Sequence, residues 1–352
     1  MSSSLKDVAA RAGVSARTVS NVVSGSARVA AETRRRVQEA IDELGYRPNL
    51  AARSLRAGRT GIIGLAIPEL HSPYFAELAG LIVEEAGKRS WTVIIDQTQG
   101  DAEAERRLLT GSGGRVMDGL IISPWALTAQ ELASAARALP IVLLGERSPQ
   151  GFADRVAVDN VSAADEATTH LLTLGRRRIA AIGLQPHLHN GTSDLRAEGY
   201  RRALRRAGIS PRPEWERTVD TLHREDGALA LAELLDGGGE IPDAVFAFSD
   251  ELALGVMHMA HQRGVRLPEE LAVVGFDDIE DGEYGHPTLT TVSPDKRQIA
   301  QLALQCLADR VYSPDNDVPP SDLTAPHRLV VRASTTQRPE SSGLRHGVGP
   351  AA

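Results

Sequence analysis

Aromatic and charged side chains recur directly after short apolar runs of the sequence. Phe75 comes soon after GLAIPEL, Trp125 comes soon after GLIIS, and Asp277 follows LAVVGF. Aromatic faces suit the apolar side of a sugar ring, while carboxylate and guanidinium groups fix hydroxyls through charge-assisted hydrogen bonds. These residue types predict a site for a small polar ligand. The candidates found in this way are His71, Tyr74, Phe75, Trp125, Glu146, Arg147, Arg196, Ser249, Asp250, Asp277 and Asp278.

A second group of polar residues lies near the N-terminus. Arg17 suits bidentate hydrogen bonding to guanine, Asn21 suits adenine, and Ala16 offers only a methyl contact to thymine. Hydroxyl side chains are better placed for phosphate oxygens, which fix the register of a protein on DNA without reading its sequence. These are Ser15, Thr18 and Ser20. The alternative interpretation is the polar face of a small helical domain.

The charge of the N-terminal segment differs from that of the rest of the chain. Residues 1–60 carry 11 Lys and Arg against 5 Asp and Glu, a net charge of +6. Because the whole chain carries −7, the remaining 292 residues carry −13. A basic head on an acidic body is typical of a nucleic-acid-binding module. Phosphate would repel the acidic body, which helps to point the head at the duplex.

Capping residues predict two short helices in this head. Ser4, followed three residues later by an acidic side chain, predicts a helix over Leu5–Ala12. Gly13 permits a tight turn, and Ser15 can cap a second helix that ends near Ser24. Two short helices joined by a turn fit a helix-turn-helix, whose second helix enters the major groove.

A third helix and a short fourth segment complete the head. The third helix runs from about Glu32 to Leu44, with Gly45 as its C-cap. Pro48 then breaks the chain, and Asn49 can cap the segment Leu50–Ala57, which is too short for a stable isolated helix in water. The apolar positions expected to form a small core are Val8, Ala9, Val19, Val22, Val23, Val37, Ala40, Ile41 and Leu44.

From Gly61 onward, short apolar runs alternate with amphipathic stretches. Runs such as GIIGLAI and AVFAF predict strands, and stretches such as YFAELAGLIVEEAGKR predict helices. This alternation predicts parallel sheets with helices on both faces. Because it starts near Gly61 and again near Arg178, we expect two similar lobes. Ligands bind outside the carboxyl ends of such strands, so the candidate residues are expected to face a cleft between the lobes.

Metal and thiol chemistry receive little support from the sequence. Cys306 is the single cysteine, so it forms no internal disulfide or cysteine-based zinc site, and its apolar helical surroundings predict a buried structural thiol. His187 and His189 resemble a metal-ligand pair, but no third ligand follows at convincing spacing. We therefore expect neither a metal nor a cofactor.

The sequence resembles the lactose/galactose-repressor (LacI/GalR) family from Leu5 to about Thr336. The match to the family's head and hinge is nearly continuous over LKDVAARAGVSARTVSNVVSGSARVAAETRRRVQEAIDELGYRPNLAARSLRAGRTGIIGL. Further on, HSPYFAEL, MDGLIIS, AVDN, DLRAEGY, AVFAFSDELALG, LAVVGFDDIE, LTTVSP and RLVVRAST follow in the family order. The resemblance implies a helix-turn-helix headpiece joined to a two-lobed, periplasmic-binding-protein-like α/β effector domain. One departure is Ala30, where the family usually has a Ser cap before the third helix.

For DNA binding, the resemblance implies a homodimer whose two heads read a pseudo-palindromic operator. It implies that Leu50–Ala57 becomes a helix only on DNA, where Leu55 wedges between base pairs in the minor groove and kinks the duplex. The alternative is that Leu55 packs on the body. The full set of expected DNA-binding residues is Ser15, Ala16, Arg17, Thr18, Ser20, Asn21, Arg28, Asn49, Arg53, Leu55 and Arg56.

For the effector, the resemblance selects Phe75, Arg196, Asp250 and Asp277 most strongly. Leu222 matches a position where relatives often place an aromatic that covers the ligand. Trp125 is predicted from its strand-end position alone, with a half-exposed surface tryptophan as the alternative. Arg196 and Asp277 could instead pair with each other across the lobes. The expected effector-binding residues are Tyr74, Phe75, Trp125, Arg147, Arg196, Leu222, Asp250 and Asp277.

These patterns divide the chain into parts with expected boundaries. They are a headpiece at 1–47, a hinge at 48–59, an effector and dimerisation domain at 60–340, and a disordered tail at 341–352. The N-lobe is expected to take about 60–160 and 292–322, and the C-lobe about 161–291 and 323–340. The tail lacks a leucine heptad, which favours a dimer over a tetramer.

The function predicted from these features is that of a cytoplasmic transcriptional repressor controlled by a sugar-like effector. A periplasmic sugar-binding protein is the first alternative, but MSSSLKDVAARAG lacks the apolar core of a secretory signal and the head is basic. An α/β enzyme is the second alternative, but G-x-S-x-G, P-loop and strand-linked G-x-G-x-x-G motifs are absent. The sequence identifies neither the effector nor the operator, and it leaves open whether the effector releases or promotes DNA binding.

Overall fold

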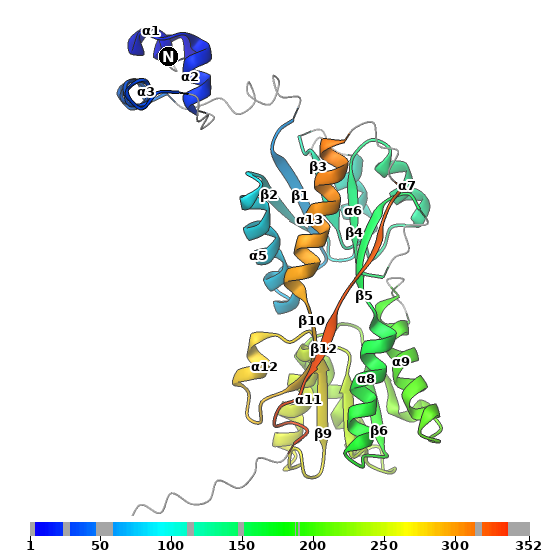
Figure 1. Cartoon of the computed structure of the whole chain (residues 1–352). Helices are drawn as coiled ribbons and strands as arrows, with labels where there is room; N and C mark the ends of the chain where they lie inside the picture. Colours follow the sequence, from blue (N-terminus) through cyan, green and yellow to red (C-terminus); the bar gives the residue numbers. More distant parts are fainter. Residues whose placement is uncertain are drawn as a thin grey trace, which may run out of the picture. The chain divides into compact units, whose positions relative to one another are not determined.

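The computed structural model describes residues 4–23, 29–46, 59–110, 116–146, 151–186, 188, 191–313 and 319–336. The chain divides into two compact units, Met1–Gly61 and Ile62–Ala352, and Figure 1 labels most of their elements. Within the described ranges, no helix is long and apolar enough to cross a membrane. The predicted hinge segment Leu50–Ala57 and the predicted tail at 341–352 lie outside these ranges.

The described residues of the first unit contain three helices where the sequence predicts them: α1 (Leu5–Ala12), α2 (Ala16–Val23) and α3 (Ala31–Leu44). Ser4 and Asp7 form a capping box, in which the Ser4 N–H donates to Asp7 Oδ2 at 2.8 Å and the Asp7 N–H donates to Ser4 Oγ at 3.3 Å. Gly13 ends α1 in the left-handed region, which glycine adopts without strain. Local capping signals therefore suffice to place α1.

The starts of α2 and α3 differ in how they are capped. The Thr18 N–H donates to Ser15 Oγ at 3.1 Å, as expected for an N-cap. Ala30 makes no side-chain cap at the start of α3, which agrees with the departure noted in the sequence. The helices enclose a small core, of which the buried members are Val8, Ala9, Ala12, Val19, Val22, Val37 and Ala40.

The second unit contains two six-stranded sheets, one in each lobe. The N-lobe sheet has the order β11-β5-β4-β3-β1-β2 and is parallel throughout. Its strands are β1 (Ile62–Ile67), β2 (Thr92–Gln97), β3 (Gly119–Ile122), β4 (Ile141–Leu144), β5 (Asp154–Val158) and β11 (Asp322–Ala325). Its helices are α5 (Pro73–Lys88), α6 (Ala102–Thr110), α7 (Ala129–Ala136) and α13 (Lys296–Tyr312).

Alternating side chains of the N-lobe strands build a core on each face of the sheet. In β3, Ile121 belongs to the cluster that includes Leu78 of α5 and Leu304 of α13. Its neighbour Ile122 belongs to a separate cluster with Leu132 of α7. Successive strand residues point to opposite faces, so an uninterrupted apolar strand buries both faces of the sheet. Cys306 of α13 is buried here, and burial raises the pKa of its thiol to about 11, as befits a structural role.

The C-lobe repeats this strand order. Its sheet runs β12-β10-β9-β8-β6-β7. Strands β6 to β10 therefore take the places that β1 to β5 take in the N-lobe sheet, and β12 takes the edge position of β11. The strands are β6 (Ile179–Leu184), β7 (Glu216–Thr218), β8 (Ala244–Ala247), β9 (Ala272–Phe276), β10 (Thr290–Pro294) and β12 (His327–Val330). The helices are α8 (Asn160–Thr173), α9 (Thr192–Arg206), η1 (Pro213–Trp215), α10 (Arg224–Asp236), α11 (Asp250–Gln262) and α12 (Glu280–Tyr284). The expected pair of similar lobes is confirmed.

One strand departs from the expected parallel sheets. β12 runs antiparallel to β10, with Val292 opposite Leu329. β10 leads the chain out of the C-lobe sheet toward α13 of the N-lobe, and β12 brings it back from β11. The two strands lie side by side, so the returning one must point the other way (Figure 1).

The chain crosses between the lobes at three places. It leaves the N-lobe between Val158 and Asn160, returns between β10 and α13, and leaves again between β11 and β12. The last two crossings lie a few residues after the expected boundaries at 291/292 and 322/323. The reason is that β10 ends only at Pro294 and β11 only at Ala325, and the chain crosses after each strand ends.

Candidate functional site

The outward face of α2 carries the residues expected to read DNA. Ser15, Ala16 and Arg17 are exposed, whereas Thr18, Ser20 and Asn21 are half-buried. Val19 and Val22 point the other way into the small core, which fixes this helix against α1 and α3. Arg28, Asn49, Arg53, Leu55 and Arg56, the other expected DNA-binding residues, lie outside the described residues.

A cavity of about 290 Å³ is lined by residues of both lobes. The N-lobe contributes the ends of β1, β3 and β4, and the C-lobe contributes the ends of β6, β8 and β9, as the strand-end argument predicts. Of the expected effector-binding residues, those that line it are Tyr74, Phe75, Trp125, Arg196, Leu222 and Asp277. Arg147 lies outside the described residues.

Aromatic rings form the N-lobe wall of the cavity. Tyr74 and Phe75, in the first turn of α5, meet edge-on with ring centroids 5.2 Å apart. Trp125, in the loop after β3, lies with its ring centroid 6.4 Å from that of Phe75. Burial raises the pKa of the Tyr74 hydroxyl, which keeps it protonated as a hydrogen-bond donor. This wall therefore presents apolar ring surface to a ligand, with the Tyr74 hydroxyl as a hydrogen-bond donor.

Glu105 of α6 holds the loop that carries Trp125. Its side chain is fully buried, and one carboxylate oxygen accepts the Trp125 N–H at 2.8 Å while the other accepts the Leu127 N–H at 2.9 Å. Gly100 approaches the tryptophan closely, since a Cβ there would lie 3.0 Å from Cε3 of Trp125. The tryptophan is therefore fixed from two sides.

Arg196 of α9 is the buried cation of the C-lobe wall. Its Nε donates to Asn160 Oδ1 at 2.7 Å, and its Nη1 donates to the carbonyl of Phe248. The guanidinium lies 3.5 Å above the ring centroid of Phe276, within the range of a cation–π contact. Burial lowers the pKa of this guanidinium. Because these contacts fix Nε and Nη1, the side chain has a defined direction in the cavity wall.

Two carboxyl groups face the same cavity. Burial raises the pKa of Glu146 to about 7, against the opposing effect of Arg155 and Arg196. Burial likewise raises the pKa of Asp277 to about 7, against the opposing effect of Arg196 and Lys296. Near neutral pH, each group therefore exists both as a hydrogen-bond donor and as an acceptor, a combination suited to hydroxyls.

Arg196 and Asp277 do form an ion pair, with Nη2 3.9 Å from Oδ1. Both residues belong to the C-lobe, so the pair does not bridge the lobes as the alternative from the sequence supposed. Contacts between the lobes come from other residues. Glu146 Oε1 accepts from Asn160 Nδ2 at 2.5 Å, and Lys296 Nζ donates to the Asp277 carbonyl at 2.8 Å.

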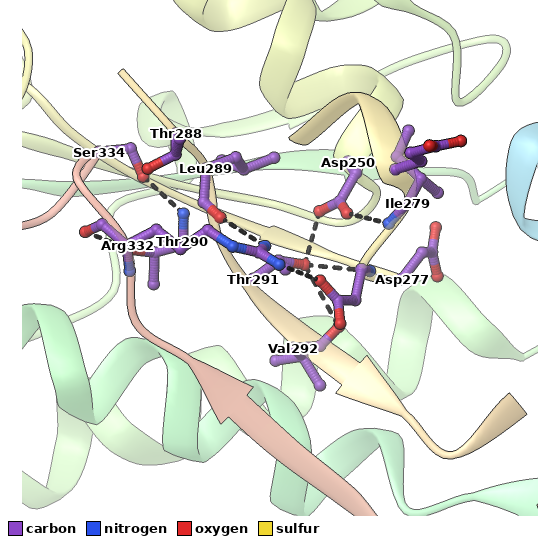
Figure 2. Close-up of polar contacts among 12 residues, drawn as sticks. Asp250, Asp277, Ile279, Thr288, Leu289, Thr290, Thr291, Val292, Arg332 and Ser334 are labelled. Atoms are coloured by element: carbon purple, nitrogen blue, oxygen red, sulfur yellow. Dashed lines mark hydrogen bonds and ion pairs between the residues drawn. The ribbon is translucent and has the colours of Figure 1, made fainter. Parts of the chain in front are cut away.

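Asp250, which is also expected to bind the effector, is held by hydrogen bonds within the C-lobe. It is fully buried at the start of α11 and is not among the residues that line the cavity. Its Oδ2 accepts from the Ile279 N–H at 2.9 Å, and its Oδ1 accepts from Thr291 Oγ1 at 2.6 Å (Figure 2). Asp250 thus ties α11 to β10 and to the loop that carries Asp277.

The comparisons with known proteins decide the family. The family model described as bacterial regulatory proteins, lacI family, matches residues 4–49, and the periplasmic binding protein-like domain matches residues 168–335. The HTH-type transcriptional repressor PurR of Vibrio vulnificus is 31% identical over 315 residues, which cover 89% of this chain and 93% of that protein. The chain belongs to the LacI family.

Two solved structures support the assignment to the LacI family along most of the chain. The lac repressor dimer bound to operator and the anti-inducer ONPF is 28% identical with a TM-score of 0.82, and the match covers 95% of this chain and 99% of that one. The transcriptional regulator CelR in complex with cellobiose is 30% identical with a TM-score of 0.69, over 94% and 99%. The expected family and fold class are confirmed, and the protein is a DNA-binding transcriptional regulator.

Several cavity residues of this LacI-family regulator escaped the sequence argument. Asn160 follows β5 and Gln185 follows β6, so the strand-end rule alone would have found both. Phe276 ends β9 and reads as an ordinary core residue, and nothing in the sequence shows that Arg196 stacks on it. His223 also lines the cavity, and no sequence pattern connects it with the first lobe.

Proposed function

We propose that this LacI-family protein is a repressor that binds a pseudo-palindromic operator as a homodimer in the cytoplasm, without catalysing a reaction. Supporting the proposal, the relative from Vibrio vulnificus is named a transcriptional repressor, and the lac repressor was solved as a dimer on its operator. Arg17 and Asn21 of α2 would read bases, and Ser15 would contact phosphate.

The effector is a small polar molecule of the sugar class, held in the cavity between the lobes. This assignment of the effector rests on one observation. Phe75 and Trp125 of the N-lobe line the same cavity as Arg196 and Asp277 of the C-lobe. An aromatic wall covers the apolar side of a sugar ring, while the charged groups hold its hydroxyls. CelR, which is similar along most of the chain, was solved with cellobiose.

Control of DNA binding follows from a difference in effector affinity between two lobe arrangements. An effector that contacts both walls favours the arrangement in which the walls are close. It shifts the equilibrium between the two arrangements only as far as its affinities for them differ. The change reaches DNA through the residues between head and body, where Leu50–Ala57 is too short to be helical alone. A small displacement of its two copies would form or melt that helix pair.

The test compares operator affinity with and without sugar in three variants. A panel of sugars that begins with cellobiose is first screened with the full chain by thermal shift. Arg196→Ala and Asp277→Asn should abolish the response of operator affinity to the active sugar, while affinity without sugar persists. Arg205→Ala, an exposed arginine on the same helix, is the matched control. A normal response in both cavity variants at the sugar concentration used for the unaltered protein would overturn the assignment of the cleft.

A further inference from the structure

Two histidines and a glutamate from different lobes meet at the mouth of the cleft. Glu69 and His71 lie in the loop between β1 and α5 of the N-lobe. His223 immediately precedes α10 of the C-lobe. His71 is the most exposed, with 64% of its side chain accessible, against 30% for His223 and 22% for Glu69. The group is therefore open to solvent ions on one side.

The three side chains each bring one possible ligand atom close to the other two. His223 Nε2 lies 3.3 Å from Glu69 Oε2, and His71 Nε2 lies 3.9 Å from the same oxygen. All three ligand atoms lie within 4.8 Å of one another. The two imidazole rings stack with centroids 5.1 Å apart and an angle of 15° between their planes, so one ring must rotate before both nitrogens can bind the same ion.

We propose that Glu69, His71 and His223 bind a divalent cation of the zinc class and that this cation bridges the lobes. Two imidazoles and one carboxylate form a ligand set that zinc accepts, with the fourth tetrahedral position left to water. Zinc bonds of about 2.0–2.1 Å place neighbouring ligand atoms about 3.4 Å apart in a tetrahedron. The Glu69–His223 distance already matches this spacing, and a change in one exposed side chain would bring His71 to it.

An ion pair alone explains this group less well. Glu69 lies within ion-pair distance of both imidazoles, and pairing with one of them leaves the other stacked beside the pair. With a metal, both imidazoles are neutral ligands and the carboxylate completes the set. The arrangement requires that the loop after β1 and the residue before α10 be within reach of each other. A bound cation therefore favours the lobe arrangement seen here, whichever effector the cavity takes.

The test is titration of Zn²⁺ alone into the full chain by isothermal calorimetry, without effector or operator. We expect a site that is lost in Glu69→Gln and in His223→Gln. Loss of an outer-shell partner already costs about 10–100-fold in metal affinity, so loss of a ligand should weaken binding by about 100-fold or more. If binding requires both Glu69 of the N-lobe and His223 of the C-lobe, the cation bridges the two lobes.

Two controls separate this site from other histidines. His286→Gln removes an exposed imidazole of the C-lobe, and the double change His187→Gln with His189→Gln removes the pair noted in the sequence. Both should bind Zn²⁺ as the unaltered chain does. Unchanged affinity in His223→Gln would overturn the proposal, as would loss of binding only in the double variant. Asp277→Asn, which tests the effector cavity, should keep its Zn²⁺ site, so failure of one proposal is distinct from failure of the other.

Discussion

Glu146 and Asp277 hold protons that the unfolded chain would release. Their pKa values rise to about 7 in the folded protein, mainly through burial, whereas unfolded Glu and Asp titrate near about 4. Between about pH 4 and pH 7 the native state binds more protons than the unfolded state. Stability from these groups is therefore fully present below about pH 4 and is lost as the pH rises through about 7.

Glu146→Gln should flatten that dependence. An amide cannot ionise, so the fall in the free energy of unfolding between about pH 5 and pH 7 should be shallower by up to about 1.4 kcal/mol per pH unit. Urea unfolding followed by tryptophan fluorescence measures it, because all three tryptophans lie in the unit Ile62–Ala352. Glu103→Gln, an exposed change on α6, is the control. Equal slopes in Glu146→Gln and the unaltered protein would contradict the burial argument.

Arg17 is exposed on α2, and its role can be separated from that of a phosphate contact. Arg17→Ala should relax base preference at one position in each half-site, at a cost of roughly 1–3 kcal/mol. Thr18→Ala, the loss of an expected phosphate contact, should weaken all operators alike. Gel shifts with a set of single-base operator variants measure both. If Arg17→Ala weakened binding to all operator variants equally, Arg17 would contact only the phosphate backbone of the DNA.

At the scale of elements, the sequence was informative where local chemistry decides the structure. Helix α1 begins and ends where Ser4 and Gly13 predict, and α3 ends where Gly45 predicts, because a cap satisfies groups within one turn. The strand-end rule brought Phe75 and Arg196 into one cavity, since the topology of parallel sheets fixes which ends meet.

Tertiary packing decided what the sequence could not show. Asp250 does lie at a strand end, yet its carboxylate turns inward because the Ile279 N–H and the Thr291 hydroxyl need an acceptor there. The hydrophobic periodicity of the sequence does not show which buried donors bond to Asp250. In the same way, His71 and His223 lie far apart in the chain, and their stacking depends on how the two lobes meet.

The loop after β3 gives a prediction at this scale. Glu105→Gln replaces one acceptor oxygen by an amide group that faces the N–H groups of residues 125–127, and an unsatisfied buried donor costs about 1–3 kcal/mol. We expect a lower melting temperature and weaker sugar binding, while the head still binds DNA. Glu103→Gln on the same helix should change neither. A Glu105→Gln protein with normal sugar affinity would show that the position of Trp125 is unimportant.

At the scale of the whole molecule, the head has a core of its own, and the proposed dimer joins two heads. Residues 1–60 alone should therefore bind the operator more weakly than the full chain, by about 100-fold or more, because linking two binding sites raises their effective concentration. Fluorescence anisotropy at one salt concentration compares the two proteins. Equal affinities would argue against a dimer on the operator.

The three crossings between the lobes also affect how such a gene can be recombined. The head occupies one continuous stretch, Met1–Gly61, so a single exchange of DNA replaces it whole and gives an old sensor a new target. Each lobe, in contrast, is assembled from separate stretches of the chain. A single breakpoint inside the sensor leaves at least one lobe with segments from two parents. Point substitutions in the cavity walls change ligand preference without mixing the packing of two parents within a lobe, whereas a new operator preference can be acquired in one exchange of the head.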